Sequence, residues 1–99
     1  IPAVRGVFYL QAGKNNLTVD KAKAFHALSE AYGFIYSLQF TRMPNTTSPY
    51  FTKAQVDTYL AQLMEGNGFW DVTPATLDAI SDEISAAFGF TTAQAAPAI

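Results

Sequence analysis

A stretch without proline, Leu17 to Arg42, constrains the fold more than any other part of the chain. On a helical wheel at about 100° per residue, apolar side chains cover most of its circumference. One face carries Ala24, Leu28, Ala31, Ile35 and Leu38. Its two flanks are widened by Phe25, Tyr32 and Tyr36 and by Ala27 and Phe34. Such a helix is typically buried by neighbours on most sides, so we predict a central helix over residues 18–42.

The ends of this central helix are marked by polar residues and by a proline. Thr18 is the expected N-cap, and Asp20 places a negative charge in the first turn, where the helix dipole favours one. Pro44 disfavours helical dihedral angles at Met43, so the helix is expected to stop near that residue.

The segment before the central helix is short and apolar. Pro2 suits the first turn of a helix and Gly13 suits the position just past its end, so we predict a helix over residues 2–12. Residues 13–16, GKNN, are expected to form a turn. A buried strand is the alternative, because the sequence VFYL is rich in strand-forming residues.

A helix over residues 53–65 has a well-marked start. Thr52 and Gln55 have the spacing of a capping box, and Gly66 is expected to end the helix in the left-handed conformation. The predicted inward face consists of Val56, Tyr59, Leu60, Leu63 and Met64.

The last predicted helix, residues 74–88, starts in the same way. Thr73 is its expected N-cap, Pro74 occupies the first helical position, and Gly89 ends it. Its inward face is predicted to hold Leu77, Ile80, Ile84 and either Phe88 or Ala87. Its solvated face is predicted to hold Asp78, Asp82 and Glu83.

The remaining segments are predicted as loops and a tail. Residues 43–50 form a surface loop by composition, and Phe69 and Trp70 are expected to fill a gap between helices. Residues 91–99 form an apolar tail that is flexible by composition and needs something to pack on if it is ordered. We therefore expect one all-α domain over residues 1–90, a small irregular bundle of three to four helices.

The composition limits the classes of function. The chain has 99 residues, of which 49% are hydrophobic and only 14% charged, whereas about 25% charged residues are usual. Such a chain is either compact or buries part of its surface against another protein. A net charge of −2 and the lack of a basic cluster argue against binding to nucleic acid or anionic membranes. No apolar run is long enough for a membrane span, and cysteines are absent.

The first residue is not methionine, so we expect a processed chain or a piece of a longer protein. The expected partners are the remainder of that protein or another protein, and an oligomer stays open.

One pair of side chains has the spacing of metal ligands. His26 and Glu30 are four residues apart, so on a helix they project in the same direction. Imidazole and carboxylate together suit zinc, iron or manganese. A third ligand would come from Asp57, Glu65, Asp71 or another chain. The alternative is an ordinary His–Glu pair on the surface of a helix, so the cofactor stays unknown, with iron or zinc as the candidates.

Patterns typical of enzymes are missing. The sequence carries no GxSxG, HExxH or phosphate-binding loop, and its acidic residues do not suggest a catalytic pair. Asn16 and Asn45 match the N-glycosylation triplet, a pattern that often arises by chance. A non-enzymatic role is therefore expected.

Three segments between Ala24 and Phe90 carry a resemblance to a known family: FHALSEAYGFIYSLQF, PYFTKAQVDTYL and GNGFWDVTPATLDAISDEISAAFGF. They resemble the C-terminal half of an uncharacterised family of helical proteins of the bacterial cell envelope. The members of that family are similar to the imelysin-type proteins of iron-uptake loci and are often lipoproteins. The resemblance implies an exported, periplasmic or cell-surface location.

The imelysin-type proteins carry a Gly-x-His-x-x-Glu motif thought to bind metal. Here Ala24 replaces the glycine, His26 matches, and Glu30 comes one residue late. The resemblance implies His26 and Glu30 as candidate ligands and gives no reason to expect peptidase activity. Two functions therefore remain. The first is a non-enzymatic envelope domain that packs against its parent protein or a partner, and the alternative is a metal-binding envelope protein linked to iron acquisition.

Overall fold

Helices form all the regular secondary structure in the described residues of the computed structural model, which are 2–41, 50–66, 68 and 71–96. Four of them build the bundle: α1 (Pro2–Asn16), α2 (Lys21–Ser37), α3 (Lys53–Leu63) and α4 (Pro74–Phe88). A 3₁₀ turn, η1 (Leu38–Phe40), follows α2, and a short helix, α5 (Thr92–Ala95), lies in the tail. The predicted all-α bundle is confirmed.

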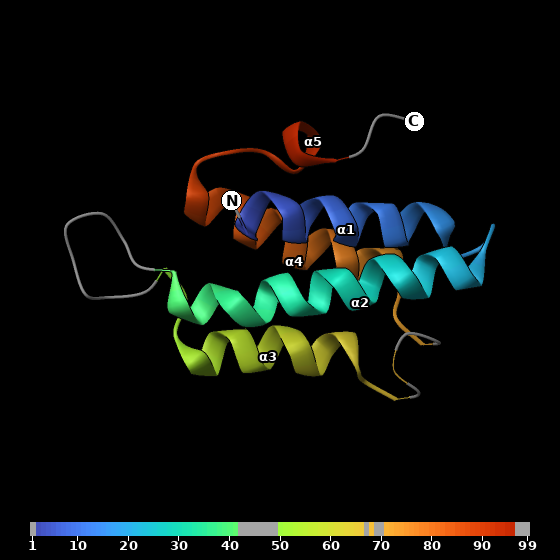
Figure 1. Cartoon of the computed structure of the whole chain (residues 1–99), viewed down its shortest axis with the longest axis horizontal. Coiled ribbons are helices and arrows are strands. Elements are labelled where there is room, and N and C mark those ends of the chain that lie inside the picture. The colour runs from blue at the N-terminus through green and yellow to red at the C-terminus, as the bar shows by residue number, and fades with distance from the viewer. Residues whose placement is uncertain (1, 42–49, 67, 69–70, 97–99) are drawn as a thin grey trace.

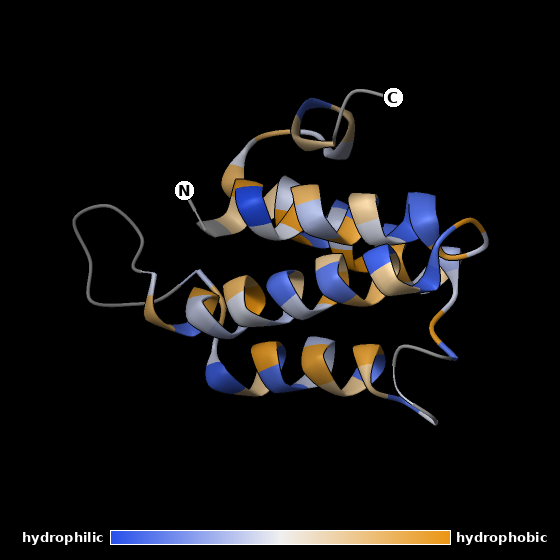
Figure 2. Cartoon of the chain, turned by 45° about the vertical axis from the view of Figure 1, so that its right-hand side comes forward, coloured by the Kyte–Doolittle hydropathy of each residue, from blue (hydrophilic) through white to orange (hydrophobic). Residues whose placement is uncertain are grey.

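The four long helices alternate in direction along the chain (Figure 1). α1 packs most extensively on α2 and next on α4, and α3 also packs on α2, below it in the view of Figure 1. α3 and α4 touch, but they share the smallest contact among the four neighbouring pairs. α5 lies against α1 and α4. Each long helix carries both hydrophilic and hydrophobic residues around its circumference (Figure 2), as expected for helices that bury one face.

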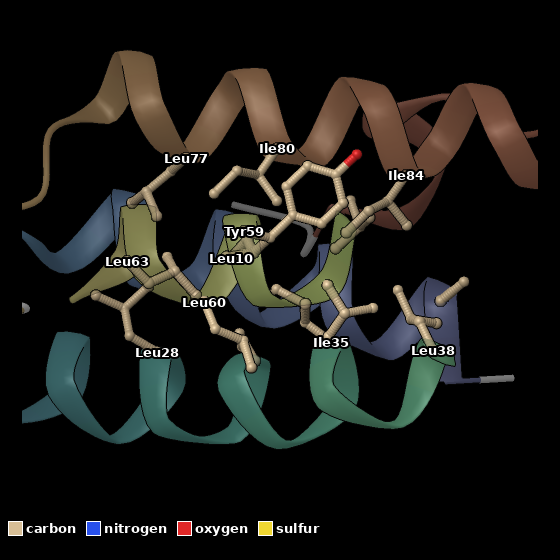
Figure 3. Packing of buried hydrophobic residues seen from close by; sticks show 14 of the residues in the cluster. Leu10, Leu28, Ile35, Leu38, Tyr59, Leu60, Leu63, Leu77, Ile80 and Ile84 are labelled. Atoms are coloured by element: carbon tan, nitrogen blue, oxygen red, sulfur yellow. The ribbon is translucent and has the colours of Figure 1, made fainter. Parts of the chain in front are cut away.

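The core is made by apolar side chains from all four long helices, which point into the space between them (Figure 3). The predicted inward residues of α2 and α4 are confirmed, with Phe88 half-buried and Ala87 exposed. On α3 the prediction holds except for Met64, which is 48% exposed because the helix has already ended at Leu63. The fully buried large side chains are Val7, Leu10, Leu28, Ile35, Leu38, Val56, Leu63, Leu77, Ile80 and Ile84.

The prediction that the central helix is buried on most sides is wrong. Only one side of α2 is buried, because α1 and α3 pack on that side and the opposite side faces solvent. Tyr32 and Tyr36, expected to widen the buried face, are 37% and 48% exposed. α2 is therefore a surface helix with aromatic side chains on its outer side.

α1 is longer than predicted, and α2 starts later. α1 continues through the predicted turn to Asn16, whose side-chain amide donates to the Ala12 carbonyl at 2.9 Å. The strand alternative for this segment is wrong. The N-cap of α2 is Asp20, not Thr18. Asp20 has extended backbone dihedrals and its carboxylate accepts a bond from the Lys23 amide at 3.1 Å, which satisfies a backbone donor that the helix leaves free.

α2 also ends earlier than predicted, at Ser37, and continues as the 3₁₀ turn η1. The Ser37 hydroxyl donates to the Phe34 carbonyl at 2.6 Å, and the Gln39 amide donates to the Tyr36 carbonyl at 3.0 Å. Side-chain bonds of this kind compete with the α-helical pattern and favour a tighter last turn. The predicted stop at Met43, Asn45 and most of the predicted 43–50 loop lie outside the described residues, as do Phe69 and Trp70.

The local signals of α3 and α4 predicted their starts correctly. The capping box is formed: the Thr52 hydroxyl accepts from the Gln55 amide at 3.2 Å and the Gln55 side chain accepts from the Thr52 amide at 2.8 Å. Gly66 has the predicted positive φ, 64°, although α3 ends three residues before it. α4 has the predicted bounds, with Thr73 as its N-cap and Gly89 at φ 80° as its C-cap.

The tail is ordered against the chain's own helices over residues 90–96. Thr91 and Gln94 form a second capping box at the start of α5. The Thr92 hydroxyl donates to the Asp82 carboxylate at 2.6 Å, and Ala95 is 6% exposed. The surface on which these residues pack belongs to α1 and α4 of the same chain.

Candidate interaction surface on α2

A row of aromatic side chains runs along the outer side of α2 into η1. Tyr32, Tyr36 and Phe40 follow one another at four-residue spacing and are 37%, 48% and 68% exposed. The Tyr36 and Phe40 rings meet edge to face, with their centroids 5.8 Å apart. Adjacent exposed aromatics are unusual on a monomer and typical of surfaces that contact another protein.

A hollow of ≈ 460 Å³ lies beside this row and is lined by Ser29, Glu30, Gly33, Phe34 and Ser37. Three of these residues are small and repeat at four-residue spacing. A Cβ added at Gly33 would meet nothing within 4 Å. Within the described residues, no other segment therefore comes close to Gly33. We call this surface the α2 outer face, which consists of Ser29, Tyr32, Gly33, Tyr36, Ser37 and Phe40.

The wall of the hollow nearest α1 is formed by an aromatic ring that packs on that helix. The Phe34 ring stacks on the Tyr9 ring of α1, with centroids 5.8 Å apart and an interplanar angle of 7°. The Tyr9 ring in turn meets the Phe8 ring edge to face at 5.1 Å. The α2 outer face is therefore a row of exposed rings beside a groove of small residues, and the Phe34 ring forms the wall of that groove toward α1. That shape accepts the ridge of side chains of another helix.

His26 and Glu30 lie on the same exposed side of α2, as the sequence predicts. Glu30 also lines the hollow. Within the described part of the chain, no group of three or more His, Cys, Asp or Glu side chains could hold a metal ion. Asp57, Glu65 and Asp71 thus do not complete a site with this pair. The metal site stays a prediction that needs ligands from outside the described residues.

A buried polar seam between α1 and α4 was missed by the sequence reasoning. Gln11, 5% exposed, donates from its amide to the Ser81 hydroxyl at 3.0 Å and to the Asp78 carboxylate at 3.1 Å. The Lys14 ammonium donates to the same carboxylate oxygen at 2.9 Å. Asp78 was expected on a solvated face, and its side chain is 47% exposed while it also bonds Lys14 and Gln11 of α1. The sign of this seam in the sequence was Ser81, a polar residue four positions after the core residue Leu77 and therefore on the same face of the helix.

The seam has a structural role. The Gln11 amide and the Ser81 hydroxyl are both engaged, and no described buried side-chain nitrogen or oxygen lacks a hydrogen-bond partner. A polar network with its groups satisfied favours one register of two packed helices over alternatives. The seam therefore fixes α1 against α4 and leaves no group free for chemistry.

The Asp78 carboxyl is expected to titrate below the usual range of an aspartate. The hydrogen bond from Lys14 is the largest cause of its lowered pKa. Burial opposes this effect, and the bond from Gln11 and the charge of Lys14 add to the lowering. Because the folded-state pKa is depressed, the pair contributes stability above the unfolded pKa of about 3.9. That contribution is lost as the pH falls through the folded pKa.

Lys14→Met is expected to raise the Asp78 pKa, which a carbon-detected NMR titration of the side-chain carboxyl measures. Lys53→Met serves as the control, since Lys53 pairs with Asp57 elsewhere. An Asp78 pKa that is equal in the wild type and in Lys14→Met would contradict the pairing.

None of the described helices is long and apolar enough to cross a membrane. The sequence profile described as a domain of unknown function, DUF4856, matches residues 1–91. No curated protein and no solved structure matches the chain.

Proposed function

The chain belongs to the DUF4856 family, and we propose that it is a non-enzymatic, exported helical domain that works by packing its α2 outer face against a helix of its parent protein or of a partner. The observation that supports this proposal most is the exposed row of Tyr32, Tyr36 and Phe40 beside the open groove at Gly33. The rings supply apolar area, and the small residues let a second helix approach closely.

The distribution of charge around this face supports the same role. Glu30 is the only charged residue among those that line the hollow, and the core of a protein interface is typically poor in charge. The ordered tail does not add to the case, because it packs on α1 and α4. The exported location in this proposal comes from the resemblance to envelope proteins of iron-uptake loci.

Native mass spectrometry and light scattering test this proposal on the purified chain. Since the partner helix is absent, exposed copies of the α2 outer face are expected to associate above the single-chain mass of 10.7 kDa. The variant Tyr36→Ser/Phe40→Ser should weaken this association at least tenfold, because each ring contributes on the order of 1 kcal/mol or more at an interface.

Val19→Ser/Met64→Ser is the matched control. It also removes two exposed apolar side chains, which are 79% and 48% exposed and lie outside the α2 outer face. Its association should equal that of the wild type, and circular dichroism should show equal helix content in all three proteins. A wild-type chain that remains a soluble monomer at several hundred micromolar would contradict the proposal.

The alternative function, metal binding linked to iron acquisition, rests on His26 and Glu30. It predicts that His26→Ala abolishes stoichiometric binding of Zn²⁺ or Fe²⁺ and leaves the helix content unchanged, since His26 is exposed. Titration calorimetry of each metal against wild type and variant measures this. Equal metal binding by both proteins would remove His26 as a ligand.

A further inference from the structure

The outer edges of α3 and α4 enclose a second surface feature, a groove made of three adjoining hollows of ≈ 230, 270 and 310 Å³. Gln62 lines all three, and Glu65 and Thr76 each line two. From the first hollow to the third, the lining residues on the α3 side come later in the sequence, whereas those on the α4 side come earlier. That order is expected for a groove along two antiparallel helices, and we call it the α3–α4 groove.

The charged side chains of the α3–α4 groove all have the same sign. Its three hollows are lined by the carboxylates Glu65, Asp71 and Glu83, and no Lys, Arg or His lines any of them. Lys53, the cation of α3, pairs with Asp57 at 2.7 Å and does not line the groove. A concave surface with carboxylates and no cation attracts positively charged groups and repels negatively charged ones.

A tyrosine that is almost completely buried reaches this groove with its hydroxyl. Tyr59 is 8% exposed and lines the ≈ 230 Å³ hollow with Gln62 and Glu83. Its ring extends from α3 toward α4, near Ile80 and Ile84 (Figure 3). No described residue forms a hydrogen bond with this hydroxyl. Since no fully buried oxygen of the described residues lacks a partner, the hydroxyl must be accessible from the hollow.

The accessible Tyr59 hydroxyl and the Glu83 carboxylate line the same hollow. Burial and the charge of Glu83 both raise the pKa of Tyr59, so the phenol stays protonated and neutral. Its oxygen, the Glu83 carboxylate and the Gln62 amide oxygen are hydrogen-bond acceptors around one hollow, and neither Gln62 nor Glu83 is bonded within the described residues. A group with several donors and a positive charge would satisfy all three.

We propose that the α3–α4 groove binds a lysine-bearing segment of a partner protein, with one lysine ammonium between the Tyr59 hydroxyl and the Glu83 carboxylate. An ammonium has three donors and no acceptor, which matches the acceptors present. The apolar stem of the lysine packs along Ala79 and the Tyr59 ring. Glu65, toward the other end of the groove, receives a second cationic side chain of the same segment.

NMR titration of the isotope-labelled chain with a blocked nonapeptide of alanine that carries three lysines tests this inference. Shifts are expected at the amides of Tyr59, Gln62, Ala79 and Glu83, and the same peptide with glutamates in place of lysines should cause none. Glu83→Gln and Tyr59→Phe should each weaken binding at least fivefold. Tyr59→Phe keeps the ring packing on Phe51, so the variant is expected to fold.

Asp57→Asn is the matched control, because it removes one exposed carboxylate of α3 that lies outside the groove. Its affinity for the lysine peptide should stay within twofold of the wild type. The inference is overturned if Asp57→Asn loses as much affinity as Glu83→Gln, which would show attraction by net charge alone. It is also overturned if spermidine binds as tightly as the peptide at the same residues, or if millimolar peptide causes no shift.

Discussion

Leu28→Ala is expected to lower the free energy of unfolding by about 2–5 kcal/mol. Leu28 is fully buried in the contact between α1 and α2, which is the most extensive contact of the bundle. Removing its terminal carbons loses apolar burial and leaves a cavity, since two helices held by many other contacts cannot close the gap fully. Urea unfolding followed by circular dichroism measures the change.

The size of this loss decides whether α1 and α2 form the structural centre of the bundle. A small domain has a total stability of about 5–15 kcal/mol, so Leu28→Ala should remove a large share of it. Val19→Ala is the control, because Val19 is 79% exposed and its replacement should change stability by no more than about 0.5 kcal/mol. A loss below about 1 kcal/mol for Leu28→Ala would contradict the close packing of these helices.

The elements predicted best from sequence are those whose ends depend on local chemistry. α4 begins and ends where predicted, because Thr73, Pro74 and Gly89 act on the backbone within one turn of themselves. The capping box at Thr52 is local in the same sense. α1 instead continues past Gly13, a residue that usually marks an end, because its backbone there packs directly against Leu28.

The buried face of α2 was predictable, but the extent of its burial was not. Helical spacing identifies Ala24, Leu28 and Ile35 as one face, and all three are buried. It cannot tell whether a second layer of helices covers the flank with Tyr32 and Tyr36. That depends on how many helices the bundle has and how they cross, and the result is the exposed aromatic row.

The polar groups of the candidate sites show the same limit. The spacing of His26 and Glu30 predicts that they share one side of α2, and the structure agrees. Whether a third ligand joins them depends on segments far away in the sequence. From the spacing of apolar residues in each helix alone, Asp78 was assigned to a solvated face and Tyr59 to the core. Their roles in the seam and in the α3–α4 groove arise from the helix that packs opposite each of them.

Gly13→Ala and Gly6→Ala, two identical substitutions in α1, are expected to change stability in opposite directions. A Cβ at Gly13 would lie 2.5 Å from Leu28 Cδ2 and 2.7 Å from its Cγ, whereas a Cβ at Gly6 would lie 3.5 Å from Phe34 Cβ, an ordinary contact. Alanine is favoured over glycine inside a helix by roughly 0.5–1 kcal/mol, so Gly6→Ala should stabilise by about that amount. Gly13→Ala should destabilise by about 1–2 kcal/mol net, because overpacking outweighs the helix preference.

Combining Gly13→Ala with Leu28→Ala separates the steric overlap between the new Cβ at position 13 and Leu28 from the other effects of Gly13→Ala. If the added Cβ is destabilising only because it meets Leu28, then the substitution should become neutral or stabilising once Leu28 has been shortened. A double-mutant cycle in urea should give a coupling energy of about 1–3 kcal/mol between the two positions. The pair Gly6→Ala and Leu28→Ala should be additive within about 0.5 kcal/mol, since the atoms nearest a Cβ at Gly6 belong to Phe34 and Ile35. Additivity at Gly13 as well would mean that α1 does not approach α2 through this glycine.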